Sequence, residues 1–206
     1  MDWLTLDDMA LANKRVLLRV DINVPIIDGQ VTDPTRIQNI APTVKEIITA
    51  GGQPILLAHL GRPGGTVDRT LSLNQIIPAL EQVFSCSVLF VADCKGPAAE
   101  TAVNLLRKGQ VLLLENTRFF KEEEQNNAAF AQKIAKLGDI FCNDAFSVAH
   151  RAHASTEAIT RFMPACVGRH LEAELVSLKK ALGSPVKPVV AIVGGSKVSS
   201  KLELLG

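Results

Sequence analysis

Short apolar runs recur along this chain, and polar or basic residues follow each of them. Five runs have the length of buried strands, at 16–20, 55–58, 111–114, 140–142 and 189–193. The runs are nearly continuous rather than alternating, a pattern typical of parallel strands covered on both faces. We therefore expect a parallel sheet with helices on each side.

Between these runs, apolar residues return with helical spacing. Asp33 and Pro34 resemble a helix start, the apolar positions from Ile37 to Ile48 share one face, and glycines at 51 and 52 end the pattern. Similar patterns predict helices at 73–84, 98–107 and 128–137, with one more strand at 87–91. This alternation predicts an α/β fold with a doubly wound, Rossmann-like sheet.

The segment 169–182 predicts one further helix. Its leucines form a stripe, its acidic residues come early and its lysines late, and Gly183 and Pro185 follow. The run at 189–193 then begins a new strand–helix unit that is unfinished at Gly206. We expect a truncated chain, unless this last strand completes the first sheet as an edge.

The composition restricts the class of protein. The 206 residues are 47% apolar but only 4% aromatic, so aliphatic side chains fill the core. The net charge of +1 argues against a nucleic-acid or membrane partner held by bulk charge. The four cysteines form no C-x-x-C pair, the N-terminus does not resemble a signal peptide, and no run has the length of a membrane span. A reducing cytoplasm is the simplest location.

Residues suited to anions follow the predicted strands. Open parallel α/β sheets bind ligands outside the carboxyl ends of their strands, and arginine matches phosphate oxygens with a planar fork. If the strands are neighbours, these side chains converge and indicate a small phosphorylated substrate. The basic candidates are His59, Arg62, Arg118, His150, Arg151 and His153.

Most of these positions also allow a plainer interpretation. Asp21 and Asn23 are common turn residues, but at a strand end they could bind substrate hydroxyl groups. Arg62 lies in a glycine-rich segment that could be a flexible surface loop with a solvated arginine. Its position directly after a buried strand favours a ligand-binding loop instead. Arg36 could equally be an exposed first-turn residue, and 121–124 resembles a solvated helix start.

Two further motifs concern metals and nucleotides. His150 and His153 have no companion ligands at metal-binding spacing, so anion binding is the better interpretation, and Asp144 could be a structural carboxylate. The glycine turn before Lys197 attracts phosphate but is neither a Walker A motif nor a dinucleotide fingerprint. Lys197 and Lys201 share a helical face, which suits a polyphosphate.

From residue 19 to its end the chain resembles the phosphoglycerate kinase family. No single motif carries this resemblance, but five occur in the order of the family. They are Arg19-Val20-Asp21-Ile22-Asn23-Val24-Pro25, His59-Leu60-Gly61-Arg62-Pro63, Glu115-Asn116-Thr117-Arg118-Phe119, Ala149-His150-Arg151-Ala152-His153-Ala154-Ser155 and Gly194-Gly195-Ser196-Lys197-Val198.

The resemblance implies two doubly wound domains joined by a long helix. It implies a substrate-binding α/β domain at 1–167, an interdomain helix at 168–183 and the beginning of a nucleotide-binding domain at 184–206. The implied reaction is reversible phosphoryl transfer between 1,3-bisphosphoglycerate and ADP, giving 3-phosphoglycerate and ATP, with the nucleotide bound as its magnesium complex.

The resemblance also assigns residues. The substrate would contact Asp21, Asn23, Arg36, His59, Arg62, Arg118 and Arg151. Arg36 and Lys197 would be catalytic, and the nucleotide phosphates would meet Gly195, Lys197 and Lys201. No metal ligand is assigned within this chain.

The length departs from the family, whose members are about twice as long. We expect a fragment that retains substrate binding only and is inactive by itself, with a monomeric full-length form. The alternative is an autonomous anion-binding or phosphate-binding α/β module without kinase activity.

Overall fold

The computed structural model describes residues 3–183, 185, 187, 189 and 190. The chain divides into two compact units, residues 1–174 and residues 175–206. The first unit contains the whole sheet and the helices that cover its two faces.

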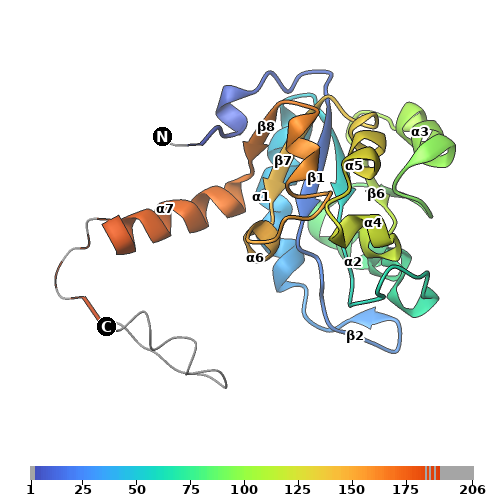
Figure 1. Cartoon of the computed structure of the whole chain (residues 1–206), viewed down its shortest axis with the longest axis horizontal. Coiled ribbons are helices and arrows are strands. Elements are labelled where there is room, and N and C mark those ends of the chain that lie inside the picture. The colour runs from blue at the N-terminus through green and yellow to red at the C-terminus, as the bar shows by residue number, and fades with distance from the viewer. Residues whose placement is uncertain (1–2, 184, 186, 188, 191–206) are drawn as a thin grey trace. The chain divides into compact units, whose positions relative to one another are not determined.

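The described residues form a six-stranded sheet in which every pairing is parallel (Figure 1). Its near-continuous apolar strands are buried, as predicted for a sheet covered on both faces. The doubly wound α/β prediction is confirmed. In their order across the sheet the strands are β5 (Val88–Val91), β6 (Val111–Leu114), β4 (Gln53–Leu57), β1 (Arg15–Val20), β7 (Ile140–Asp144) and β8 (Ala165–Val167).

Helices cover both faces because successive side chains of a strand point to opposite sides. Val16 and Leu18 pack with α1 (Thr35–Thr49) and α2 (Ile77–Phe84), whereas Leu17 packs with α3 (Gly96–Leu105) and α5 (Ala128–Ala135). The other long helix is α7 (Arg169–Gly183). The short elements are η1 (Leu6–Asp8), β2 (Ile26–Ile27), β3 (Gln30–Val31), η2 (Arg69–Leu71), η3 (Leu73–Ile76), η4 (Thr117–Phe119), α4 (Lys121–Glu124), α6 (Phe146–Ala149) and η5 (Ala158–Arg161).

One strand of the sheet was not predicted, and one predicted strand lies mostly outside the described residues. The edge strand β8 has only three residues between Pro164 and Gly168, too few for a visible apolar period. The predicted strand at 189–193 lies mostly outside the described residues, and its described residues Val189 and Val190 are in no strand.

Several helix boundaries also differ from the prediction. Helix α1 begins at Thr35, one residue after Pro34, and Asp33 Oδ1 accepts a hydrogen bond from the Thr35 backbone N–H at 2.9 Å. The pattern at 73–84 divides into η3 and α2, with Pro78 in the first turn of α2, because proline has no N–H to continue a helix. Helices α3 and α5 end at Leu105 and Ala135, before the predicted ends.

The start of α7 is fixed by Asp144 at the end of β7. Asp144 is buried, which raises the pKa of its carboxyl group, and its Oδ1 accepts the Leu171 backbone N–H at 2.9 Å. A Cβ atom at Gly168 would lie 2.4 Å from Asp144 Cγ. Only glycine therefore allows this approach, and Asp144 is the structural carboxylate that the sequence suggested.

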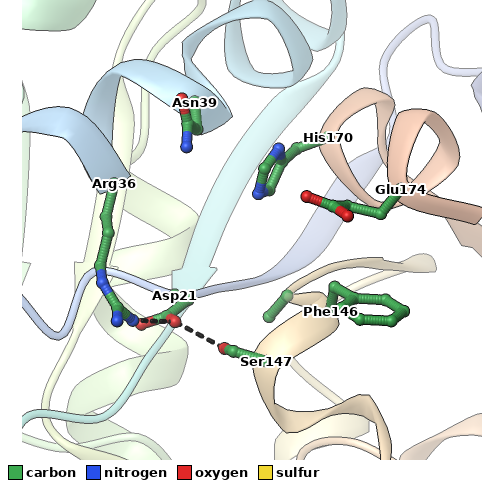
Figure 2. Close-up of a pocket in the computed structure, with 8 residues that line it drawn as sticks. Asp21, Arg36, Asn39, Phe146, Ser147, His170 and Glu174 are labelled. Atoms are coloured by element: carbon green, nitrogen blue, oxygen red, sulfur yellow. Dashed lines mark hydrogen bonds and ion pairs between the residues drawn. The ribbon is translucent and has the colours of Figure 1, made fainter. Parts of the chain in front are cut away.

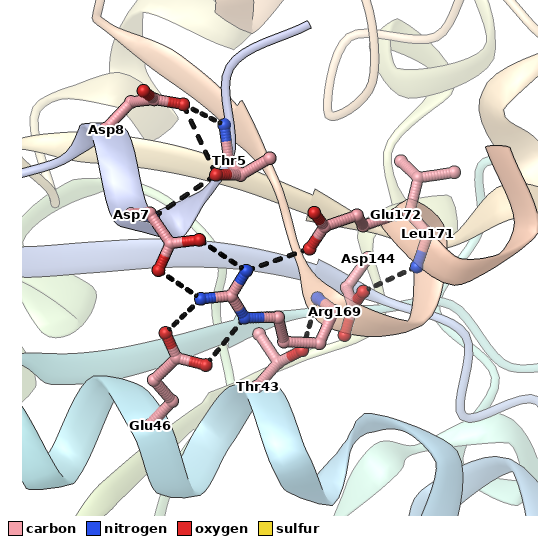
Figure 3. Close-up of polar contacts among 9 residues, drawn as sticks. All are labelled: Thr5, Asp7, Asp8, Thr43, Glu46, Asp144, Arg169, Leu171 and Glu172. Carbon is pink, nitrogen blue, oxygen red and sulfur yellow. Dashed lines mark hydrogen bonds and ion pairs between the residues drawn. The ribbon is translucent and has the colours of Figure 1, made fainter. Parts of the chain in front are cut away.

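Arg169, the first residue of α7, binds three carboxylates (Figure 3). Its Nη2 lies 2.6 Å from Asp7 Oδ1 and 2.6 Å from Glu46 Oε1, and its Nη1 lies 2.8 Å from Glu172 Oε2. Hydrogen bonds to Glu46 and Asp7 raise the pKa of Arg169. The side chain thus connects the N-terminal segment, α1 and α7 through charge-assisted bonds.

We expect Arg169→Met to lower the free energy of unfolding by about 1–3 kcal/mol, because it breaks a network of charge-assisted bonds rather than one surface pair. Arg161→Met is the matched control, since Arg161 forms a single exposed pair with Glu157 at 2.7 Å. That variant should change stability by less than about 0.5 kcal/mol. Urea denaturation of both variants measures the difference, and equal losses would contradict the network.

Candidate functional site

A cavity of about 240 Å³ lies at the carboxyl ends of the central strands. The seven substrate contacts assigned from the sequence all line it, so the structure brings them together. The lining residues are Asp21, Asn23, Arg36, His59, Gly61, Arg62, Arg118, Ser147, Val148 and Arg151.

The sheet topology explains why residues so far apart in sequence meet here. The chain passes from β1 to β4 in one direction across the sheet, and from β6 to β7 in the other. In the register, Arg19 pairs with Leu57 and Val20 pairs with Asp144, so β1, β4 and β7 end side by side. A reversal of strand order of this kind creates a crevice at the carboxyl edge.

Three arginines give the cavity its positive charge. Arg118 is buried, its Nη1 donates to the Gly61 carbonyl oxygen at 3.0 Å, and its Nε lies 3.5 Å from Glu124 Oε1. Burial lowers the pKa of Arg118, and the neighbouring guanidinium groups of Arg151 and Arg62 lower it further, against the opposing effect of Glu124. A bound anion would relieve this repulsion.

Asp21 lines this cavity together with Arg36 and Ser147, and Figure 2 shows the contacts of Asp21 with both side chains. Its Oδ2 accepts the Ser147 hydroxyl at 2.5 Å and forms an ion pair with Arg36, while its Oδ1 accepts the Asn23 backbone N–H at 3.1 Å. Burial acts to raise the pKa of Asp21, but these hydrogen bonds and Arg36 outweigh it and hold the pKa below its usual value. Asp21 is therefore both a turn residue and an ionised cavity residue.

The loop after β4 is anchored through its backbone. Asn23 Oδ1 accepts the Gly61 N–H at 2.9 Å, and the buried Asn116 donates to the Leu60 carbonyl oxygen at 2.8 Å. Gly61 has a φ of +63°, and a Cβ there would lie 2.8 Å from Leu71 Cδ2. The glycine thus lets the loop fold closely enough to present Arg62, whose side chain is exposed.

His59 is a buried cavity residue, only 5% exposed. Its Nδ1 lies 3.1 Å from Arg19 Nη2. Burial, followed by the nearby charges of Arg19 and Arg118, lowers the pKa of His59 to about 3. The imidazole is therefore neutral at neutral pH.

The buried polar residues next to the cavity were not predicted from the sequence. The segment 121–124 resembles a solvated helix start, but Glu123 in α4 is fully buried and accepts hydrogen bonds from both the backbone N–H and the hydroxyl of Ser155, at 2.9 and 2.5 Å. Arg19 appeared only as part of a motif. Its one visible signal is that it is a charged residue inside the otherwise apolar run 16–20.

An adjoining cavity of about 270 Å³ shares Asp21, Arg36 and Ser147 with the first. Figure 2 shows His170 and Glu174 of α7 opposite Arg36 across this space. The sequence did not predict a contribution from α7 to the site, since these residues are far from every motif.

Part of the predicted site lies outside the described residues, namely Gly195, Lys197 and Lys201. Within the described part of the chain, no group of three or more His, Cys, Asp or Glu side chains is arranged to hold a metal ion. In the same part, no helix combines the length and hydropathy needed to cross a membrane.

Comparisons with known proteins agree on one family. A family model described as phosphoglycerate kinase matches residues 6–206. A phosphoglycerate kinase of Ruegeria pomeroyi is 63% identical over 206 residues, covering 100% of this chain and 52% of that protein. One of Allorhizobium ampelinum is 58% identical over 202 residues, covering 98% of this chain and 50% of that protein.

Solved structures give the same result. The structure of phosphoglycerate kinase from Coxiella burnetii matches with a TM-score of 0.87 and 39% identity, covering 98% of this chain and 51% of that chain. Phosphoglycerate kinase from Pyrococcus horikoshii matches with a TM-score of 0.88 and 30% identity. The chain spans about half the length of the curated relatives it matches.

The pKa of His59 predicts a pH dependence of stability. The unfolded chain protonates this residue below about pH 6.5, whereas the folded chain resists protonation down to about pH 3. The unfolded state therefore binds the extra proton within this window, and stability falls as the pH decreases through it.

His59→Gln should remove this contribution, because glutamine does not titrate. The pH slope of the unfolding free energy should decrease by up to about 1.4 kcal/mol per pH unit relative to the unmodified chain. Denaturant titrations at several pH values between about 4 and 7 provide the measurement. If the unfolding free energies of the two proteins have the same pH slope, His59 does not resist protonation in the folded chain.

Proposed function

The chain belongs to the phosphoglycerate kinase family, and we propose that its α/β unit forms the half of the active site that binds 3-phosphoglycerate or 1,3-bisphosphoglycerate. For the whole protein we propose reversible phosphoryl transfer between 1,3-bisphosphoglycerate and ADP. We retain the domain division at 1–167, 168–183 and 184–206, a cytoplasmic location and a monomeric full-length form as parts of this proposal.

The observation that carries the proposal is the convergence of the seven assigned residues on one cavity. The cavity combines two chemistries. Arg62, Arg118 and Arg151 provide positive charge for a phosphate group, and Asp21 and Asn23 provide groups that bind hydroxyls. A small phosphorylated hydroxy acid needs both, whereas a simple anion needs only the first.

The binding mode follows from these positions. The three arginines would hold the phosphate that is not transferred, with Arg118 fixed in place by its bond to Gly61. Asp21, Asn23 and His59 would contact the glycerate end. Because Asp21 and Arg36 form an ion pair in the described structure, ligand binding would have to compete with that pair or add to it.

Phosphoryl transfer requires positioning and charge stabilisation rather than covalent help from the protein. The cosubstrate in this proposal is a magnesium nucleotide. Magnesium ATP would supply the phosphoryl group, and in the reverse direction magnesium ADP would accept it. The substrate carboxylate is already ionised, so it needs no general base to attack. Arg36 would offset negative charge near that carboxylate, and the assigned nucleotide contacts Gly195, Lys197 and Lys201 lie outside the described residues.

We expect the 206-residue chain to bind 3-phosphoglycerate saturably in a calorimetric titration, more tightly than glycerate or inorganic phosphate. The autonomous anion-binding module predicts a different result, namely similar affinity for unrelated phosphates. Absence of any binding would show that this half-site does not form a working pocket in the chain.

Substitutions separate the two chemistries. Arg151→Met should weaken both 3-phosphoglycerate and inorganic phosphate by about tenfold, the value of one charge-assisted contact. Asp21→Asn should lower the ratio of 3-phosphoglycerate affinity to phosphate affinity. The variant loses a carboxylate that binds the glycerate end, whereas removal of a negative charge does not weaken the binding of phosphate. Arg107→Met, at an exposed position that precedes β6, is the matched control and should alter neither. If Asp21→Asn leaves this affinity ratio unchanged, the result favours the autonomous anion-binding module.

We expect negligible turnover when the chain is given 3-phosphoglycerate and magnesium ATP, because the resemblance assigns most nucleotide contacts to a second domain. A coupled assay of ADP release measures this. Robust activity in a preparation free of contaminating kinase would contradict the prediction.

A further inference from the structure

Arg19 is a buried cation in the central strand of the sheet, with 1% of its surface exposed. Each of its nitrogens has a partner. Nε donates to Ser155 Oγ at 3.1 Å, Nη1 donates to the Val20 carbonyl oxygen, and Nη2 lies 3.1 Å from His59 Nδ1. A guanidinium group has donors but no acceptor, so Nη2 must donate to the ring nitrogen.

This direction determines where His59 carries its proton. A ring nitrogen that accepts a hydrogen bond holds no hydrogen, so the neutral imidazole must carry its proton on Nε2. Nε2 has no hydrogen-bond partner among the described residues, and His59 lines the cavity. The ring therefore has one satisfied nitrogen and one free donor.

We propose that Arg19 is a positioning residue that locks His59 in the Nε2–H tautomer, so that the ring offers a hydrogen-bond donor to an oxygen of the bound substrate. The identity of that substrate rests on the proposed function. The other tautomer would turn a lone pair towards the ligand oxygen and would leave Arg19 Nη2 without an acceptor.

A second layer of buried groups holds Arg19 itself. The Ser155 hydroxyl donates to Glu123 Oε1 at 2.5 Å, so its lone pairs are available to Arg19 Nε. Glu123 also accepts the Ser155 backbone N–H, and its charge favours the Arg19 cation. Arg19 thus donates in two directions, through Ser155 to Glu123 of α4 and directly to His59 at the cavity, and every donor and acceptor in the chain Glu123–Ser155–Arg19–His59 is assigned.

The charges around His59 support the neutral ring. Arg19, Arg118 and His153 disfavour its protonation, Asp21 favours it, and burial is the largest influence, so the pKa falls to about 3. A neutral ring keeps Nδ1 as an acceptor for Arg19 across the physiological pH range. Protonation would place a hydrogen on Nδ1 and break that bond.

The tautomer can be read directly by NMR. Long-range ¹H–¹⁵N correlation spectra of the 206-residue chain, labelled with ¹⁵N-histidine, report which ring nitrogen is protonated, and the spectrum of His59→Gln identifies the His59 signals. At neutral pH we expect the proton on Nε2. A proton on Nδ1 would overturn the proposal, whether or not the chain binds 3-phosphoglycerate.

The Arg19→Met variant tests the cause. We expect its His59 to populate both tautomers and its affinity for 3-phosphoglycerate to fall by about tenfold, the loss of one well-placed hydrogen bond. Arg15→Met is the matched control, because Arg15 lies in the same strand and pairs with Asp139 at 2.7 Å, away from the cavity. It should retain the tautomer and the affinity, and an unchanged tautomer in Arg19→Met would overturn the role of Arg19.

Ser155→Ala keeps the Arg19 charge and serves if Arg19→Met does not fold. It removes the acceptor of Nε, and we expect some of the second tautomer and an affinity loss of about threefold, less than a whole hydrogen bond. Full retention of tautomer and affinity would overturn the positioning chain. If the unmodified chain shows Nε2–H but binds no 3-phosphoglycerate, the proposed function fails while the tautomer assignment stands.

Discussion

The buried guanidinium of Arg19 is the constraint on which the site depends. Removing a cation from water costs several kcal/mol unless hydrogen bonds and an opposite charge replace the solvent. Its replacements come from the end of β4, from the segment after α6 and from α4, through His59, Ser155 and Glu123. Because β1 occupies a central position in the sheet, these segments must gather around it when the fold forms. Assembly of the cavity is therefore part of assembly of the sheet.

The cavity illustrates how a nearly neutral chain can create a strongly basic site. The net charge is only +1, so the positive field is local. One carboxylate, Asp21, is paired with Arg36, whereas Arg62 and Arg151 lie close enough to Arg118 to lower the pKa of its guanidinium group. Their repulsion is tolerated because the backbone anchors Arg118 and the other two side chains are exposed. This arrangement is suited to an anion with additional hydroxyl groups.

The end of β7 serves two purposes at once. Asp144 holds the first turn of α7 through the Leu171 N–H, and the next residues lead into α6, which brings Ser147 to Asp21. Arg169 adds bonds from α7 to α1, the helix that carries Arg36. Buried and half-buried polar contacts thus connect the start of α7 both to β7 and to α1, which supplies the cavity residue Arg36.

The sequence by itself determined the central strands, the apolar faces of the helices and seven of the residues that line the cavity. Apolar period is a local property, and in a parallel sheet the residues after each strand must meet at one edge, so Asp21, His59 and Arg118 could be placed together without coordinates. Only the tertiary structure decided the burial of Glu123, the hydrogen-bond partners of Arg19 and the short strand β8. Arg19 and Ser155 are 136 positions apart, and no local pattern encodes a contact over that separation or the direction of its hydrogen bonds.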